Sequence, residues 1–324
     1  MSKISSKISP KVSVCIPTFN RANLLPIAIA SVLEQTYSNW ELIICDDGST
    51  DGTVEHMNCY TDERIRYVRH AQNVGKSNNM RSGFEAATGE YFIKFDDDDR
   101  LAPEFLSKTS QILDQNPHVD FVGTDHWVIN SNGDRNLETT QLNSQKWGRT
   151  ELKEGIVQNL LEVVFIRQSF QIGATLFRRS VLQELGFMRP NIQNCEDNDL
   201  LVRLALAKKQ AYYLPECLME YRFHDGQQGI DRAIPYLKDK LNYLESFQFT
   251  SETLENVRRS RMIETQLLLG LRLIEKGDTQ KGRELVLAGK SNSSLKAYSG
   301  FVLSFFPPIA RKPAFELLRG VRSS

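Results

Sequence analysis

The sequence lacks the features that define several large classes of protein. Its 324 residues carry no excess charge, because 40 Lys and Arg balance 40 Asp and Glu. Proteins that bind nucleic acid over a broad surface are usually basic, so we expect no nucleic-acid partner. Hydrophobic residues make up 40% of the chain and charged residues 25%, which excludes an intrinsically disordered protein.

Cysteine and long apolar runs are scarce. The five cysteines, at positions 15, 45, 59, 195 and 217, are scattered and form no CxxC motif. We therefore expect free thiols in a reducing, cytoplasmic compartment rather than a disulfide framework. No run of 18 apolar residues occurs, and residues 1–10 are polar, so we expect neither a membrane-spanning helix nor a signal peptide.

The glycine-rich motifs of two nucleotide-binding classes are also missing. Neither GxGxxG nor GxxxxGK[ST] occurs, which argues against a dinucleotide-binding dehydrogenase and a P-loop enzyme. A shorter segment, Asn73–Lys76, contains Gly75. Its Lys76 either approaches a phosphate or is a solvated lysine after a simple turn.

Short apolar runs alternate with helical spacing over the first 130 residues. Strands are predicted at Val12–Ile16, Trp40–Cys45, Ile65–Val68, Tyr91–Phe95 and Val119–Ile129. Helices are predicted at Asn23–Gln35, Ser77–Ala87 and Pro103–Gln115. This alternation indicates an α/β fold whose mostly parallel sheet is flanked by helices. Residues 131–189 show weaker periodicity.

Three polar segments follow predicted strands: Thr18–Arg21, Asp46–Asp51 and Asp96–Asp99. Ligands of open α/β sheets bind beyond the carboxyl ends of the strands, so these segments are expected to converge there. Four adjacent carboxylates repel one another, and a hard cation such as Mg²⁺ or Mn²⁺ would offset that repulsion. The alternative is a solvated acidic turn that caps the next helix, but the position at a strand end favours the metal site.

Two later segments carry further candidate residues. Glu196 and Asp197 stand in the first turn of a helix predicted from the apolar spacing after Leu200. The helix dipole alone explains acidic residues there, but such a carboxylate is also suited to accept a proton from a hydroxyl. His224 ends an apolar segment before a glycine-containing loop, and either a structural role or ligand contact fits it.

Six motifs in order over about Lys11–Gly229 resemble those of a family 2 glycosyltransferase, an inverting enzyme with the GT-A fold. They are Val14–Arg21, Glu41–Asp51, Asn73–Tyr91, Asp96–Asp99 with Pro103, Glu196–Asp197 with Leu200, and Tyr221–His224. The resemblance implies a transfer from a nucleotide-diphosphate sugar, a UDP-sugar by preference, to a hydroxyl. The acceptor would be a glycan or a lipid-linked saccharide of surface polysaccharide biosynthesis.

The resemblance also implies roles for individual residues. Asp197 would be the catalytic base, beside Glu196. The metal, Mn²⁺ or Mg²⁺, would be held by Asp98, with Asp96 and His224. Asp96 would contact either the ribose or the metal, and since this chain has Asp97 where the family usually carries a small residue, which carboxylates bind the metal stays open. The donor would contact Pro17, Thr18, Asn20, Arg21, Asp46, Asp47, Lys76, Asp96 and Asp97. Gly173, Ala174 and Asp99 would face the acceptor.

The last third of the chain is predicted to be helical and lies outside the resemblance. Thr253–Lys276 and Thr279–Lys290 resemble a helix pair joined at Gly277. We expect a leader at 1–10, a catalytic domain at 11–232, divided into a donor half (11–130) and an acceptor half (131–232), and a helical region at 233–324.

The tail from Lys281 onward is basic, with eight Lys or Arg against two Glu. Together with the apolar cluster Phe301–Phe306, it would suit contact with the cytoplasmic face of an anionic membrane. The alternative, equally weighted, is a cap that packs on the catalytic domain.

Two other functions compete with sugar transfer. A nucleotidyltransferase of the same general fold would need a glycine-rich basic loop near the N-terminus, and Pro17–Arg21 contains no glycine. A non-catalytic module that binds a nucleotide or a glycan would be expected to have lost Asp98 or Asp197, and both are present.

Overall fold

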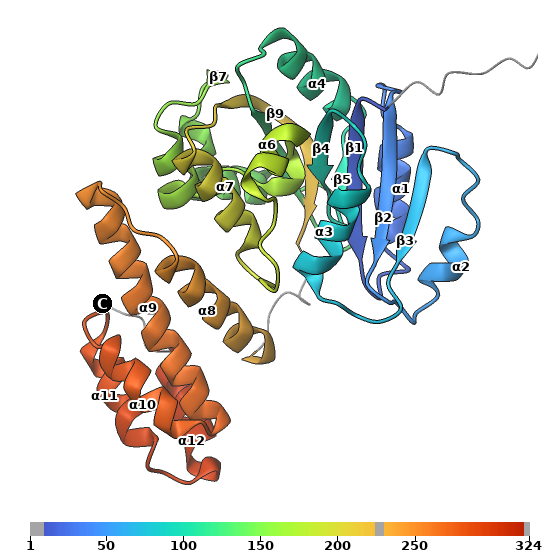
Figure 1. Ribbon diagram of the computed structural model, residues 1–324. Helices are drawn as coiled ribbons and strands as arrows, with labels where there is room; N and C mark the ends of the chain where they lie inside the picture. The colour runs from blue at the N-terminus through green and yellow to red at the C-terminus, as the bar shows by residue number, and fades with distance from the viewer. Residues whose placement is uncertain (1–9, 224–229, 321–324) are drawn as a thin grey trace, which may run out of the picture. The chain divides into compact units, whose positions relative to one another are not determined.

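The computed structural model describes residues 10–223 and 230–320. The chain forms two compact units (Figure 1). The first contains Met1–Ile192 and Glu196–His224, and the second contains Gln193–Cys195 and Asp225–Ser324. The predicted site residues within the described ranges belong to the first unit.

A nine-stranded mixed sheet forms the centre of the first unit. The path through it is β3 (Ile65–Arg69), β2 (Trp40–Asp46), β1 (Val12–Thr18), β4 (Tyr91–Lys94), β8 (Thr175–Arg178), β6 (Phe121–Ile129), β9 (Ala211–Arg222) and β5 (Arg100–Leu101), with β7 (Gly155–Ile156) paired to β9. The strands from β3 to β4 are parallel, as are β6 and β9, whereas β8, β5 and β7 pair antiparallel. The fold is therefore of the expected α/β class.

The first strands are continuous apolar runs because both of their faces are covered. Every residue of β1, β2 and β4 is buried, as is typical of parallel strands between helical layers. The flanking helices are α1 (Leu25–Leu33), α2 (Thr53–Met57), α3 (Lys76–Ala86) and α4 (Phe105–Gln115). In α3, Gly83 lies so close to β1 and β2 that a Cβ would stand 2.3 Å from Cys15 Sγ and 2.5 Å from Cys45 Sγ.

The weakly periodic middle segment folds into short elements. These are α5 (Leu137–Lys146), the 3-10 turns η1 (Arg149–Glu151) and η3 (Ile172–Ala174), the π-helical η2 (Glu162–Arg167) and α6 (Arg179–Leu185). A buried ion pair ties this segment to β6: Arg149 Nε donates to Asp125 Oδ1 over 2.7 Å, and Ser144 donates to the same carboxylate. Contacts between distant residues, rather than local periodicity, therefore hold this part in place.

The five cysteines are free thiols, as predicted. Cys15 and Cys45 lie in the adjacent strands β1 and β2 with their sulfur atoms 3.8 Å apart. The absence of a disulfide framework is consistent with a first unit that is stabilised by its apolar core.

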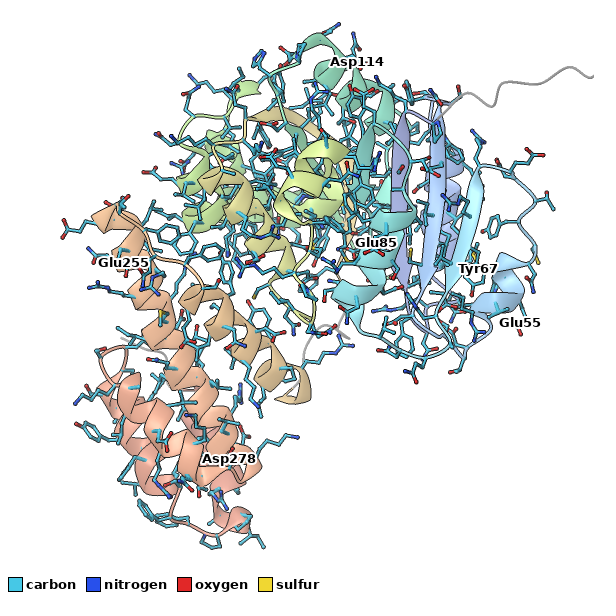
Figure 2. The ribbon with its side chains drawn as sticks, viewed as in Figure 1. Glu55, Tyr67, Glu85, Asp114, Glu255 and Asp278 are labelled. Carbon is cyan, nitrogen blue, oxygen red and sulfur yellow. The ribbon has the colours of Figure 1, made fainter. Side chains whose placement is uncertain are left out.

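The second unit is helical. It comprises α8 (Ile230–Glu245), α9 (Glu252–Lys276), α10 (Thr279–Ala288), α11 (Ser294–Leu303) and α12 (Pro308–Gly320). The predicted helix pair is confirmed as α9 and α10. Gly277 ends α9 with φ of 109°, and Asp278, labelled in Figure 2, accepts a hydrogen bond from the Lys281 amide at the start of α10. Over residues 10–223 and 230–320, no helix has both the length and the apolar character needed to cross a membrane.

Candidate active site

The carboxyl ends of β1, β2 and β4 bring the three predicted polar segments together, which confirms their convergence. Thr18 Oγ1 donates to Asp97 Oδ2 over 2.7 Å, which joins the end of β1 to the turn after β4. The Asn20 amide donates to Ser49 Oγ over 2.9 Å, and Asn20 Oδ1 accepts from the Thr50 amide over 2.8 Å. These bonds join β1 to the loop after β2.

The two carboxylates that follow β2 shape the surrounding loops. Asp46 is buried and accepts hydrogen bonds from the Ser49 amide and from the hydroxyl of Tyr67, which Figure 2 labels on β3. Asp47 accepts from the backbone amides of Val74 and Gly75, over 2.7 and 3.1 Å. Asp47 therefore fixes the segment that leads to Lys76, the first residue of α3.

Each of the four aspartates after β4 has a different partner. Both carboxylate oxygens of Asp96 lie 2.8 Å from Lys94 Nζ. Asp97 accepts from Thr18, and Asp98 Oδ2 lies 4.0 Å from Arg21 Nη1. Asp99 is buried, and its Oδ1 accepts from the Arg222 amide over 2.8 Å. The four carboxylates therefore point toward different neighbours.

The acidic turn holds negative charge that its neighbours offset only in part. Burial, together with the charges of Asp98 and Asp96, raises the pKa of Asp97 to about 7 against the bond from Thr18. Burial and the charges of Asp96 and Asp98 also raise the pKa of Asp99 well above its ordinary value. Burial would raise the pKa of Asp96 too, but the positive charges of Lys94 and Lys76 lower it.

Lys94, the last residue of β4, is a site residue that the sequence reading missed. Its side chain is only 1% exposed, and its Nζ lies 2.8 Å from Asp96 and 3.8 Å from Asp197 Oδ2. Burial lowers the pKa of Lys94, but Asp197 and Asp96 raise it above its ordinary value, so the ammonium stays charged. The signal available in the sequence was a lysine among the apolar residues of the predicted strand Tyr91–Phe95.

Glu196 and Asp197 lie in the first turn of α7 (Glu196–Leu206), as predicted. Glu196 is buried and its Oε1 lies 2.6 Å from Lys76 Nζ. The side chain of Asp197 is 31% exposed, and its Oδ1 has no hydrogen-bond partner among the described residues. Burial raises the pKa of Asp197 to about 6, Lys94 opposes that rise, and Glu196 adds to it.

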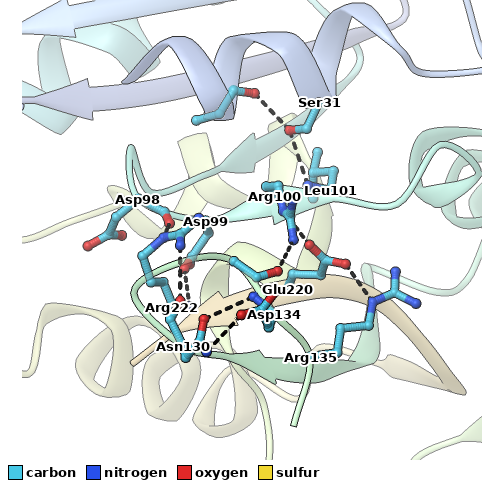
Figure 3. A network of polar contacts seen from close by, with 12 residues as sticks. Ser31, Asp98, Asp99, Arg100, Leu101, Asn130, Asp134, Arg135, Glu220 and Arg222 are labelled. Atoms are coloured by element: carbon cyan, nitrogen blue, oxygen red, sulfur yellow. Dashed lines mark hydrogen bonds and ion pairs between the residues drawn. The ribbon is translucent and has the colours of Figure 1, made fainter. Parts of the chain in front are cut away.

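Arg222, at the end of β9, ties the acidic turn to the loop after β6 (Figure 3). Its Nε donates to the Asp98 carbonyl over 2.7 Å, and its Nη1 donates to the carbonyls of Asn130 and Ser131, each over 3.0 Å. The residue is 3% exposed. Beside it, Glu220 pairs with Arg100 and Arg135. Arg222 is therefore a positioning residue for the turn, and the sequence reading assigned it no role.

We expect loss of the Arg222 guanidinium to destabilise the first unit. In Arg222→Met, the carbonyls of Asp98, Asn130 and Ser131 lose a charged donor, while the backbone bond to Asp99 remains. We expect the free energy of unfolding of the first unit to fall by about 2–4 kcal/mol. Arg135 is the control, because its side chain is half exposed. Arg135→Met should lower the free energy of unfolding by less than about 1 kcal/mol. Urea denaturation of both variants measures the difference, and equal losses would refute this role.

Four other predicted residues lie elsewhere or outside the described ranges. Gly173 and Ala174 are buried in η3, where the Ala174 amide donates to Gln171 Oε1 over 2.9 Å. Pro17 is buried within β1. His224 lies outside the described residues. Their assigned contacts with acceptor, donor and metal stay predictions.

The chemistry of the acidic turn suits a hard divalent cation. Among the described residues, no group of three or more His, Cys, Asp or Glu side chains is arranged to hold a metal. Mg²⁺ and Mn²⁺, however, are commonly held by one or two carboxylates with phosphate oxygens and water. Burial is the main cause of the raised pKa of Asp97, and the charges of Asp98 and Asp96 add to it; a cation beside these two carboxylates would offset their part.

Comparison with known proteins defines the class. The family model described as "Glycosyl transferase family 2" matches residues 13–186. Since this is more than half of the chain, the chain belongs to glycosyl transferase family 2. The match ends before Glu196 and Asp197.

Individual relatives agree with this class. The putative teichuronic acid biosynthesis glycosyltransferase TuaG of Bacillus subtilis is 30% identical over 217 residues, which cover 66% of this chain and 79% of TuaG. The chain spans less than half the length of several other curated relatives, at 46%, 24% and 20%.

Two solved structures share the fold. TarS 1–349 of S. aureus, in complex with UDP-GlcNAc, has a TM-score of 0.63 at 15% identity. The match covers 96% of this chain and 93% of the TarS chain. The mannosyltransferase PcManGT of Pyrobaculum calidifontis, in complex with GDP-Man and Mn²⁺, has a TM-score of 0.58 at 16% identity. This match covers 97% of this chain and 89% of the PcManGT chain. The first unit therefore has the GT-A fold.

Proposed function

We propose that the chain is an inverting, metal-dependent glycosyltransferase. It would move a sugar from a nucleotide-diphosphate sugar to a hydroxyl of a glycan or a lipid-linked saccharide, in the synthesis of a surface polysaccharide. The observation that carries this proposal is Asp197, whose side chain is 31% exposed beside the acidic turn. Its Oδ2 lies 3.8 Å from Lys94 Nζ, and its buried Oδ1 has no hydrogen-bond partner among the described residues. The five free cysteines favour a reducing, cytoplasmic setting.

The reaction we propose is a single displacement. The acceptor oxygen forms a bond to the anomeric carbon as the bond from that carbon to the diphosphate breaks. The electron pair of the broken bond leaves with the nucleotide diphosphate, and Asp197 accepts the hydroxyl proton. Attack on the face opposite the diphosphate inverts the anomeric configuration, and no covalent enzyme intermediate forms.

The residues around Asp197 would bind and orient the donor. Thr18, Asn20 and Arg21 at the end of β1, and Asp46 and Asp47 at the end of β2, would hold the nucleoside, with Pro17 and Lys76. Asp98 and Asp96, with His224, would hold Mg²⁺ or Mn²⁺, which supplies positive charge to the leaving diphosphate. The ligands of TarS and PcManGT support a nucleotide-sugar donor, and UDP is the nucleotide we favour.

A panel of nucleotide-sugars tests the proposal. Purified protein is incubated with each donor and Mn²⁺ or Mg²⁺, and release of nucleotide diphosphate is followed beside Asp98→Ala and the exposed control Glu138→Ala. We expect release from one donor that stops in Asp98→Ala and persists in Glu138→Ala. Donor binding is measured by calorimetry on the same samples. Failure of every nucleotide-sugar to bind in the presence of metal would refute the transferase and favour a binding module.

The pKa of Asp197 predicts the pH dependence of transfer. The carboxylate form accepts the proton, and burial places its pKa at about 6. As pH falls through about 6, this group becomes protonated, so kcat/KM should fall about tenfold per pH unit below that value and level off above it. Rates measured from acidic to neutral pH, with the donor bound at saturation, check this. A profile that is flat through pH 6 would contradict Asp197 as the base.

A further inference from the structure

The most exposed apolar surface of the described residues lies in the second unit. Six large apolar side chains are exposed within the short span from Leu295 to Ile309, which runs from α11 through the following turn into α12. We call them the α11 face: Leu295, Tyr298, Val302, Phe305, Phe306 and Ile309. Leu295, Phe305 and Ile309 are 65%, 67% and 87% exposed. The other large exposed apolar residues are spread from Phe19 to Leu287.

The α11 face is distinct from the side of the helix that packs inside the unit. Ala297 and Gly300 of α11 are buried against the core of Leu271, Ile274 and Val286. Leu295, Tyr298 and Val302 recur at helical spacing on another side of the same helix. The helix α11 therefore packs inside the second unit without Leu295, Tyr298 and Val302. Packing within the unit does not explain why these three residues are apolar.

The charged residues along this segment of the chain have one sign. Between Glu284 and Glu316 the chain contains four Lys or Arg and no Asp or Glu. Lys290 is exposed just before α11, and Lys296 lies within it. On α10, the Arg283 guanidinium lies 4.9 Å from the centre of the Phe305 ring. One of the four, Arg311, is buried and donates to the Ile274 carbonyl over 2.8 Å. Arg311 therefore stabilises the second unit and is not one of the exposed cations beside the α11 face.

We infer that the α11 face binds the surface of an anionic lipid bilayer. Aromatic and branched side chains that project beside basic residues enter the boundary between headgroups and acyl chains, while the cations contact the anionic headgroups. Charge complementarity favours this occupant, because the chain from Leu285 to Phe315 carries basic residues and no acidic ones, which suits a uniformly negative surface. The inference depends on the second unit alone and does not require sugar transfer by the first.

Vesicle sedimentation with the full chain tests this inference. The wild type is mixed with vesicles of phosphatidylcholine alone, and with vesicles of phosphatidylcholine and phosphatidylglycerol in equal parts. We expect binding to the anionic vesicles that weakens as salt rises, because exposed charges are screened. Phe306→Ser with Ile309→Ser should lower the bound fraction at least about tenfold, and Lys290→Glu with Lys296→Glu should lower it as well.

A matched double variant controls for the loss of exposed apolar surface. Leu137→Ser with Leu142→Ser removes two exposed residues of α5 in the first unit and should bind like the wild type. Equal binding by wild type and Phe306→Ser with Ile309→Ser would overturn the inference, as would no binding to anionic vesicles. A concentration-dependent dimer that the same double variant abolishes, without lipid binding, would assign the α11 face to a second copy of this chain. Circular dichroism of each variant excludes unfolding as the cause.

Discussion

Asp197→Asn is expected to lower kcat for transfer by about 10³-fold, within the range that a positioned general base contributes. Asparagine keeps the size of the side chain but cannot accept the proton of the acceptor hydroxyl. Donor binding should change little, because the nucleotide is expected to contact the ends of β1 and β2 rather than α7. Single-turnover rates with donor and acceptor, together with calorimetric donor affinity, separate the two effects.

The stability of this variant distinguishes a base from a structural residue. The folded-state pKa of Asp197, about 6, lies above its ordinary value, so ionisation of this group opposes folding above that pH. Removing the charge should therefore not lower the unfolding midpoint at pH 7. The exposed control Glu184→Gln should leave both rate and midpoint unchanged. A slow variant that is also markedly unstable would point to a structural role for Asp197.

Lys94→Met is expected to have the largest effect on stability. The ammonium is buried between Asp96 and Asp197, and its removal leaves two carboxylates of the site without their nearest cation. Breaking a buried pair in this way typically costs about 3–5 kcal/mol. Lys108→Met is the matched control, because Lys108 and its partner Glu216 are 41% and 42% exposed, so that breaking their pair should cost less. Chemical denaturation of the two variants, followed by a spectroscopic signal from the first unit, measures the difference in their free energy of unfolding.

The loss in Lys94→Met should depend on pH in a defined direction. Lys94 lowers the pKa of both Asp96 and Asp197, so its removal raises both pKa values in the folded state. The deficit should therefore be largest near neutral pH, where both groups must ionise, and should shrink as acid protonates them. The acidic limb of the rate profile should also move to higher pH. A deficit that is independent of pH would show that Lys94 acts only through packing.

The sequence predicted the first half of the fold because local patterns control it. β1, β2 and β4 are buried apolar runs that end in polar segments, and a parallel sheet brings such ends to one edge. The position of Asp197 in a first helical turn also followed from local spacing. The antiparallel β8, only four residues long, carries no comparable pattern and is placed by pairing with β4 and β6.

The residues that the sequence did not reveal are buried cations with distant partners. Lys94 is a lysine within the predicted strand Tyr91–Phe95, and only the folded chain shows that it lies between Asp96 and Asp197. Arg222 reads as one basic residue near His224, although its partners lie in the turn after β4 and the loop after β6. Partners more than 90 positions away leave no periodicity for a sequence pattern to detect.

The lysines of the site also affect the order in which the protein can be assembled. Lys94 and Lys76 place two permanent positive charges among the six carboxylates of Asp96–Asp99, Glu196 and Asp197, and Arg21 lies at the edge of the same group. A newly synthesised chain therefore carries its own counter-ions for this cluster. We therefore expect folding to need neither a divalent ion nor a nucleotide, unlike that of small domains whose folding depends on a metal.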